Sequence, residues 1–388
     1  MFRLRAFTFN TAPSIQFGAG ALARIGELVM SRIGDHILLI TDPGMIATGH
    51  VDRALGCLRE RGISVSVFSD VEADPPEHVI LSALDMARTD AVHGVVGMGG
   101  GSSLDCAKLV ALLAANDQRL AEIYGVGKAR GPRLRLILIP TTAGTGSEVT
   151  PIAIVTTGTH EKMGVVSPVI LPDVALLDPE LTLGLPPHIT AATGIDAMVH
   201  AIEAYASVSP NNNPISRNLA TQALTLMGGS LEQAVRHGDD VEARSNMLLG
   251  SLLAGQAFAN SPVAAVHALA YPIGGHFNVP HGLSNALVLP HVLRFNAKVA
   301  PKPYAELAPF VFPDLMPLEG QARAEAFCDA LAELSRRCGL QQRLSELDIP
   351  REILPKLASD AMNQTRLLVN NPREVSEADA LAIYQAAW

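Results

Sequence analysis

Short apolar runs alternate with helical patterns through the first half of the chain, and this alternation restricts the possible fold more than any other feature. Runs of strand length occur at residues 36–42 (HILLITD), 63–71, 91–98 and 134–140, with helical patterns between them at about 50–61, 77–88 and 104–115. Continuous apolar runs of this length are typical of parallel strands buried on both faces. The pattern predicts a Rossmann-like α/β domain built on a parallel sheet.

The sequence changes character at residues 183–187, where two prolines and a glycine interrupt the pattern. From about His188 onward, long helical patterns rich in alanine and leucine predominate. A chain of 388 residues exceeds the usual size of one hydrophobic core. We therefore expect an α/β domain over residues 1–184 and an all-helical domain over residues 185–388.

Composition and charge narrow the possible partners. Hydrophobic residues make up 48% of the chain and charged residues only 17%, which predicts a folded protein. A net charge of -9 without a block of lysine and arginine argues against binding to nucleic acid or to an anionic membrane surface. Residues 245–293 lack charged side chains, but Gln256, Asn260 and Pro262 interrupt them, as in a buried core helix and unlike a membrane span.

The spacing of the cysteines and the sequence of the N-terminus indicate the cellular compartment in which the protein is expected. The four cysteines are widely spaced and form no CxxC pair, which is typical of reduced thiols. The first ten residues, MFRLRAFTFN, lack the apolar core of a secretory signal. We expect a cytoplasmic protein that acts on a small molecule.

Two glycine-rich turns follow predicted strands. The first includes Gly99, Gly100, Gly101 and Ser102 and opens a helix; the second, TTAGTGS, includes Thr141, Thr142 and Thr145. Glycines let backbone amides approach a phosphate closely, and a helix N-terminus adds favourable partial charge. The first turn departs from the GxGxxG fingerprint, and alone it is equally compatible with a simple tight turn. Together, the two turns favour a dinucleotide site.

Asp42 ends the run HILLITD. An acidic residue at a strand end can accept hydrogen bonds from ribose hydroxyls and repel a 2′-phosphate, which favours NAD over NADP. The alternative is a structural aspartate that caps the turn before Pro43 and Gly44.

Asp196 and His200 stand four residues apart in a helical pattern, and His267 and His281 follow later in the chain. Residues at this spacing lie one turn apart on one helix face. One carboxylate and three imidazoles suit a divalent first-row metal, Fe(II) or Zn(II). The alternative is four unrelated polar residues with separate hydrogen bonds. Because the metal candidates lie in the helical half and the glycine turns in the α/β half, we expect a cleft between the domains to join them.

The chain resembles the iron-containing (group III) alcohol dehydrogenase family in five segments. They are FGAGAL, GGGSSLD, IPTTAGTGSEVT, AATGIDAMVHAIEAY and HALAYPIGGHFNVPHGLSNALVLPHV, in that order roughly from Phe17 to Asn296. The resemblance implies the architecture shared with dehydroquinate synthase and NAD-dependent interconversion of small alcohols with aldehydes or ketones. It also implies a homodimer.

The resemblance assigns roles to particular residues. It carries metal binding onto Asp196, His200, His267 and His281, with Fe(II) expected and Zn(II) as the alternative. It carries cofactor binding onto Asp42, the turn from Gly99 to Ser102, Thr141, Thr142, Thr145 and Lys162.

One position departs from the family pattern. Many members have a histidine four residues after the third metal ligand, whereas this chain has Tyr271. A tyrosine, with an intrinsic pKa near 10, is a poorer proton shuttle at neutral pH than imidazole. Tyr271 and the nearby His276 are the candidates for proton transfer. A tyrosine here also resembles the hydroxyacid-oxoacid transhydrogenase branch, which is an alternative activity.

Three further alternatives differ in chemistry. A dehydroquinate-synthase-like lyase would need lysines and arginines for its acidic substrate, and residues 245–293 contain none. A metal-free reductase related to maleylacetate reductases is disfavoured by the complete set of metal-ligand candidates. A noncatalytic scaffold would have no need for that set beside two phosphate-type turns.

Overall fold

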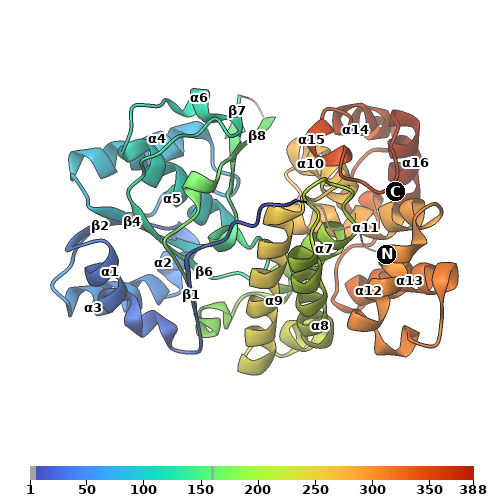
Figure 1. The fold of residues 1–388 in the computed structure, drawn as a ribbon, viewed down its shortest axis with the longest axis horizontal. Helices are drawn as coiled ribbons and strands as arrows, with labels where there is room; N and C mark the ends of the chain where they lie inside the picture. The colour runs from blue at the N-terminus through green and yellow to red at the C-terminus, as the bar shows by residue number, and fades with distance from the viewer. Residues whose placement is uncertain (1–5, 159–160) are drawn as a thin grey trace. The chain divides into compact units, whose positions relative to one another are not determined.

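The computed structural model describes residues 6–158 and 161–388, and it divides into two compact units (Figure 1). Residues 10–142 and 146–182 form the first, which we call the α/β unit. Residues 183–388 form the second, the helical unit, together with residues 6–9 and Ala143–Thr145. An α/β unit followed by a helical unit confirms the predicted fold class.

The α/β unit contains a six-stranded sheet in which every pairing is parallel. Its strands, in spatial order, are β1 (Ser14–Phe17), β9 (Val174–Leu177), β6 (Arg135–Pro140), β4 (Gly94–Gly99), β2 (His36–Ile40) and β3 (Ser64–Phe68). A smaller sheet consists of β5 (Gly125–Val126), β8 (Glu161–Val166) and β7 (Ile152–Thr157), with β7 antiparallel to β8.

Helices cover both faces of the larger sheet (Figure 1). Leu38 and Ile40 of β2 pack in a cluster with α4 and α5, whereas Ile37 and Leu39 pack in another cluster with α1 and α3. Successive side chains of a strand point to opposite faces, so burial on both faces explains the unbroken apolar run. The helices of this unit are α1 (Ile25–Arg32), α2 (Pro43–Ala47), α3 (His50–Arg59), α4 (Glu77–Thr89), α5 (Gly101–Ala114) and α6 (Leu120–Ile123).

The strand order reverses between β2 and β4. From β2 the chain continues to β3 on one side, and it then returns to place β4 on the other side of β2. Ligands of open α/β sheets bind beyond the carboxyl ends of the strands at such a reversal. Asp42 follows β2, and the glycine turn follows β4. The topology thus brings two predicted cofactor elements to the same edge.

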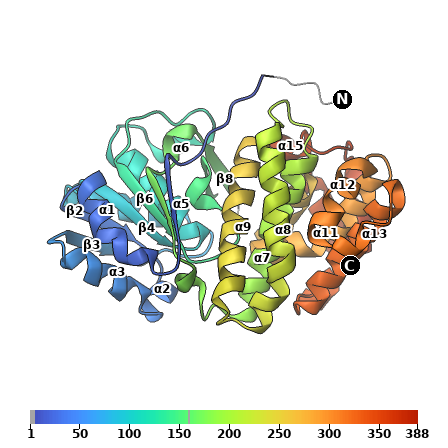
Figure 2. The same ribbon diagram turned by 60° about the horizontal axis from the view of Figure 1, so that its bottom comes forward.

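The helical unit is organised around α7, whose residues are buried along most of its length. Helices α8, α9 and α11 pack against it, and Figure 2 shows α7, α8 and α9 side by side. The helices are α7 (Pro187–Ala206), α8 (Pro214–Arg236), α9 (Val241–Asn260), α10 (Ala265–Phe277), α11 (His281–Ala297), α12 (Pro301–Val311), α13 (Gly320–Arg337), α14 (Leu354–Ala361), α15 (Thr365–Leu368) and α16 (Glu377–Ala387).

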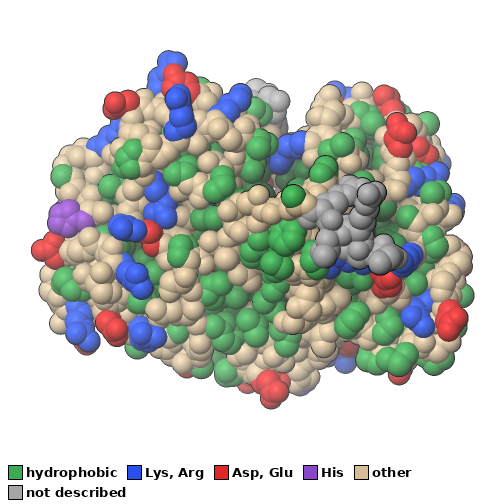
Figure 3. Space-filling view, viewed as in Figure 1, with side chains coloured by type: hydrophobic (Ala, Val, Ile, Leu, Met, Phe, Trp, Pro, Cys, Tyr) green, Lys and Arg blue, Asp and Glu red, His purple; other side chains and the backbone are tan. Residues whose placement is uncertain are grey.

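Short 3₁₀ helices connect the longer elements of both units. They are η1 (Ala21–Arg24), η2 (Ser147–Val149), η3 (Pro168–Ile170), η4 (Pro179–Thr182), η5 (Pro313–Leu315), η6 (Leu344–Leu347) and η7 (Arg351–Ile353). Among the described residues, none of the helices combines the length and apolarity that crossing a bilayer requires. On the face shown in Figure 3, positive and negative side chains are scattered among polar and apolar ones.

A buried lysine ties α5 to the loop after β6. Lys108 is fully buried, and its ammonium donates hydrogen bonds to Ser147 Oγ (2.7 Å) and to the carbonyl of Ile152 (2.7 Å). It also pairs with Asp105 at 3.3 Å. Burial lowers the pKa of Lys108, and Asp105 opposes that effect. The network fixes the position of the chain where it leaves the second glycine-rich turn.

We predict that Lys108→Met lowers the stability of the protein by about 3–5 kcal/mol, because it removes one partner of a buried ion pair. The same change at Lys128, an exposed lysine of the same unit, should cost less than about 0.5 kcal/mol. Urea denaturation of both variants checks the difference. Equal, small effects would show that the network contributes little.

Candidate active site

Helix α7 carries two of the metal-ligand candidates inside the helical unit. Asp196 and His200 lie one turn apart on its inner face and are only 2% and 5% exposed. A proline at the start of the helix fits its first turn, where no intrahelical hydrogen bond is lost. The burial of both groups requires partners from neighbouring helices.

Those partners are at the first turns of α10 and α11. His267 Nε2 lies 3.8 Å from Asp196 Oδ1, and the His267 ring stacks on that of His200 at 4.7 Å between centroids. His281 begins α11, and its Nε2 is also 3.8 Å from Asp196 Oδ1. Its side chain is 36% exposed, so it is the most open of the four candidates. The structure thus brings together all four residues that the sequence nominated as metal ligands.

Asp196, His200 and His267 fit a divalent cation, and His281 lies beside them. Ligand atoms of Asp196, His200 and His267 all lie within 4.8 Å of one another. Two ligand atoms that share one ion at about 2.0–2.2 Å are at most about 4.4 Å apart, so the 3.8 Å separations require little adjustment. In addition, the Nε2 atom of His267 is buried and has no hydrogen-bond partner in the part of the chain that the structure describes. A buried polar atom without a partner is costly, and a bound cation would satisfy it.

The protonation states also suit metal binding. Burial lowers the pKa of His200 to about 3, so its imidazole is neutral at physiological pH. Burial opposes ionisation of Asp196, but the surrounding imidazoles and the amide of Asn285 outweigh it and lower the pKa of that carboxyl. A neutral imidazole and an ionised carboxylate are the forms that bind a metal.

Sequence reasoning missed two residues of this cluster. Glu203 accepts a hydrogen bond from His267 Nδ1 (2.7 Å), and Asn285 donates one to Asp196 Oδ1 (2.6 Å). Both were detectable by helical spacing, because Glu203 lies seven residues after Asp196 and Asn285 lies four after His281. Their hydrogen-bond partners on other helices could not be detected from the sequence.

The two candidates for proton transfer have different surroundings. The ring of Tyr271 lies 5.6 Å from that of His281. Burial raises the pKa of Tyr271, which leaves it protonated and able to donate a hydrogen bond at neutral pH. His276 is more exposed and is bonded to Asp360 at 2.7 Å. Its recorded contacts are with Asp360 and Phe277, away from the ligand cluster.

In the α/β unit, Asp42 meets the first glycine turn. Its Oδ1 accepts the N–H of Met45 and caps α2, and its Oδ2 accepts the hydroxyl of Ser103. Gly99 has φ 148°, and a Cβ there would collide with Asp42 and Ser103. The capping role considered as an alternative for Asp42 is therefore present, and its carboxylate also lines the turn.

The other cofactor candidates surround the same turn. Thr141 is buried, and its N–H donates to the carbonyl of Gly99, while Thr142 lies 3.8 Å from the position of a Cβ on Gly100. Ser102 Oγ accepts the N–H of Asp74, whose carboxylate pairs with Lys162 at 2.9 Å.

Unlike these residues, Thr145 does not belong to the α/β unit. It belongs to the helical unit with the other residues of Ala143–Thr145. In that segment the carbonyl of Gly144 faces His200 Nδ1 at 3.3 Å. Because a carbonyl only accepts, Nδ1 is the protonated nitrogen, and Nε2 of His200 is available to a metal.

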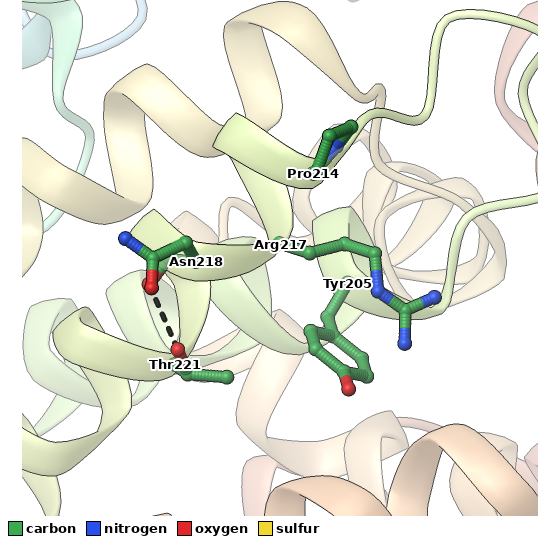
Figure 4. A pocket seen from close by; sticks show the side chains of 5 residues that line it. All are labelled: Tyr205, Pro214, Arg217, Asn218 and Thr221. Carbon is green, nitrogen blue, oxygen red and sulfur yellow. Dashed lines mark hydrogen bonds between the residues drawn. The ribbon is translucent and has the colours of Figure 1, made fainter. Parts of the chain in front are cut away.

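A separate hollow of about 240 Å³ lies on the surface of the helical unit (Figure 4). Its lining residues are Tyr205, Pro214, Arg217, Asn218 and Thr221. The Arg217 guanidinium lies over the Tyr205 ring at 3.9 Å and pairs with Glu306 at 3.0 Å. The hollow contains none of the candidate metal ligands, and its cation already has a carboxylate partner. It is therefore a poor candidate for the active site.

Comparison with known families covers almost the whole chain. Residues 12–179 match the family described as iron-containing alcohol dehydrogenase, and residues 190–388 match the C-terminal part of the Fe-containing alcohol dehydrogenase family. The chain is 42% identical over 386 residues to long-chain-alcohol dehydrogenase 1 of Geobacillus thermodenitrificans (strain NG80-2), covering 97% of this chain and 95% of the relative.

Solved structures agree with these matches. A crystal structure of 1,3-propanediol oxidoreductase superposes with a TM-score of 0.95 at 35% identity, covering 99% of this chain and 100% of the other. Sulfoacetaldehyde reductase from Bifidobacterium kashiwanohense, solved in complex with NAD+, gives a TM-score of 0.87 at 30% identity, covering 99% of each chain.

We predict that His267→Ala abolishes stoichiometric metal binding, because it removes a buried ligand from the centre of the cluster. NAD binding should persist, since its candidate residues lie mainly in the α/β unit. Metal analysis after dialysis, together with NAD titration by fluorescence, measures both effects. His276→Ala, on the same helix, is the control and should retain the metal. Full metal occupancy in His267→Ala would place the ion elsewhere.

Proposed function

The chain belongs to the iron-containing alcohol dehydrogenase family, and from this premise we propose that it is an NAD-linked dehydrogenase of small alcohols whose divalent cation is held by Asp196, His200, His267 and His281. Fe(II) is the expected ion, and Zn(II) is the alternative. The observation that carries the assignment is the buried, unpartnered Nε2 of His267 among the other ligand candidates.

In this proposal the helical unit holds the cation, and the α/β unit holds the nicotinamide cofactor. A cation bound to the cluster supplies Lewis-acid polarisation of an alcohol or carbonyl oxygen, and a nicotinamide supplies the hydride acceptor or donor. The helical unit holds the ligands in neutral and ionised forms that suit the cation. The ring of Phe258 stacks on His200 at 4.3 Å and keeps water from that face.

Tyr271 is our candidate for the residue that donates a hydrogen bond to the substrate oxygen. Its raised pKa keeps the phenol protonated, and its ring lies beside that of His281. His276 is bonded to Asp360, which makes it the weaker candidate.

In the α/β unit, we assign the cofactor to the edge where the strand order reverses. The turn from Gly99 to Ser102 offers backbone amides and the start of α5 to a pyrophosphate. Asp42, at the end of the neighbouring strand, favours the ribose of NAD over the 2′-phosphate of NADP. Thr141, Thr142, Thr145 and Lys162 remain candidates for the rest of the dinucleotide.

Two broader expectations accompany this assignment. All four cysteines are free, as expected in a reducing compartment such as the cytoplasm. The homodimer implied by the family resemblance stays a prediction. None of the relatives named above is a transhydrogenase or a lyase, and the dehydrogenase is the function we adopt.

Anaerobic reconstitution tests the proposed activity. We expect the Fe(II)-loaded protein to reduce added NAD in the presence of a small primary alcohol or diol, measured as the absorbance of NADH. Chelator-treated protein should be inactive, and Fe(II) should restore it. A hydroxy acid paired with an oxo acid, without free NAD, is the control for the transhydrogenase. Activity only in that control would overturn the dehydrogenase assignment.

Cofactor preference tests Asp42. We expect Asp42→Asn to increase the ratio of kcat/KM for NADP to that for NAD by up to about 100-fold. Two unit charges about 5 Å apart repel by about 3 kcal/mol at an effective dielectric constant of about 20. Asparagine is also a good N-cap, so α2 should persist. Asp52→Asn, on the exposed face of α3, is the control. An unchanged ratio in Asp42→Asn would assign Asp42 to helix capping alone.

A further inference from the structure

The carboxylate of Glu203 gathers three hydrogen bonds from the start of α10. It accepts the backbone N–H of Ala264 (2.9 Å) and of Val266 (2.7 Å), and it accepts Nδ1–H of His267 (2.7 Å). Glu203 is itself only 5% exposed. Because two of the three donors belong to the backbone of one helix turn, the carboxylate is fixed in position relative to His267.

This arrangement fixes the tautomer of His267. Both carboxylate oxygens already accept backbone N–H groups, so Nδ1 of His267 is the donor in its contact with Glu203. Nε2 then carries a lone pair, and this buried atom has no hydrogen-bond partner among the described residues. It lies 3.8 Å from Asp196 Oδ1. The ring is therefore held with its metal-binding nitrogen towards Asp196 before any cation arrives.

The charges in this region point to the same conclusion. Asp196 and Glu203 are both buried on α7, and neither forms an ion pair with a lysine or arginine among the described residues. Residues 245–293, which include α10 and the start of α11, contain no charged residue other than histidine. Two buried carboxylates match the charge of a divalent cation, so binding of the ion relieves an otherwise costly burial.

We propose that Glu203 is a positioning residue that sets the affinity of the site for its divalent cation. It acts by orienting His267 and by adding the second negative charge. A carboxylate behind a metal-bound histidine fixes the ring and strengthens it as a ligand, and loss of such a partner typically weakens metal binding about 10–100-fold. The inference rests on the proposed function in one respect, that the cation binds at Asp196, His200, His267 and His281.

Glu203 also has a structural role that the experiment must separate. Its carboxylate replaces a side-chain cap for α10, whose N-cap residue, Ala264, offers none. Removing it will weaken the start of that helix as well as the orientation of His267. Loss of thermal stability or of activity alone would therefore not distinguish the two roles.

Glu203→Gln is the variant for the test. The side chain keeps its size and one acceptor oxygen, but it loses the charge and presents an amide that cannot accept from a backbone N–H. Binding of Co2+ and Zn2+ to the apoprotein is measured by competition with a chromophoric chelator. The visible absorption bands of bound Co2+ report the ligand geometry directly. Neither measurement depends on turnover.

Tyr384→Phe is the matched control. Tyr384 lies on α16 and is fully buried. Its hydroxyl donates to the carbonyl of Leu269 on α10, two residues after His267. The variant removes a buried hydrogen bond from α10 without altering the ligands or Glu203. We expect both variants to lower the Tm of the apoprotein, but only Glu203→Gln to weaken Co2+ and Zn2+ binding, by about 10–100-fold, and to change the Co2+ spectrum.

The outcomes separate this inference from the proposed function. If Glu203→Gln binds both ions as tightly as the unmodified protein, with the same Co2+ spectrum, the positioning role is wrong. If Tyr384→Phe weakens binding equally, the effect belongs to the stability of α10, and the inference again fails. If His267→Ala retains full affinity, the assignment of the metal centre itself is wrong, whatever Glu203 does.

Discussion

The burial of two carboxylates on α7 is the constraint on which the helical unit depends. Asp196 and Glu203 lie seven residues apart on one face, and neither has a lysine or arginine partner among the described residues. Glu203 instead accepts hydrogen bonds from the start of α10, including His267, whereas Asp196 accepts the side-chain amide of Asn285 on α11. The N-terminus of a helix offers unpaired N–H groups and positive partial charge, so it is suited to face a buried carboxylate.

A glycine at the start of α11 allows this helix to pack closely against α7. A Cβ on Gly282 would collide with the carbonyl of Ala192 on α7, so glycine at this position permits the contact between the helices. Gly282 directly follows His281, and its close approach holds that histidine beside Asp196. The candidate metal centre, which is assembled from separate helices, thus depends on a residue with no functional group.

The sequence predicted what depends on local pattern. The strands β2, β4 and β6 are continuous apolar runs, and these three and β3 lie where the pattern placed them. The edge strand β1, which pairs with β9 far along the chain, and the local β7–β8 hairpin were not predicted. The same division applies to the site: the spacing of Asp196 and His200 was readable in the sequence, whereas the contacts of Glu203 and Asn285 with residues more than sixty positions away were not.

The segment TTAGTGSE shows why some irregular chain is nevertheless readable. Thr141 and Thr142 belong to the α/β unit, the next three residues belong to the helical unit, and the chain returns at Gly146. The carbonyl of Gly144 faces His200, and a Cβ on Gly144 would collide with Thr193. Gly146 has φ 59°, and Ser147 binds the buried Lys108. Because successive residues meet separate steric and hydrogen-bonding demands, few sequences satisfy them all, and such a loop becomes a recognisable motif.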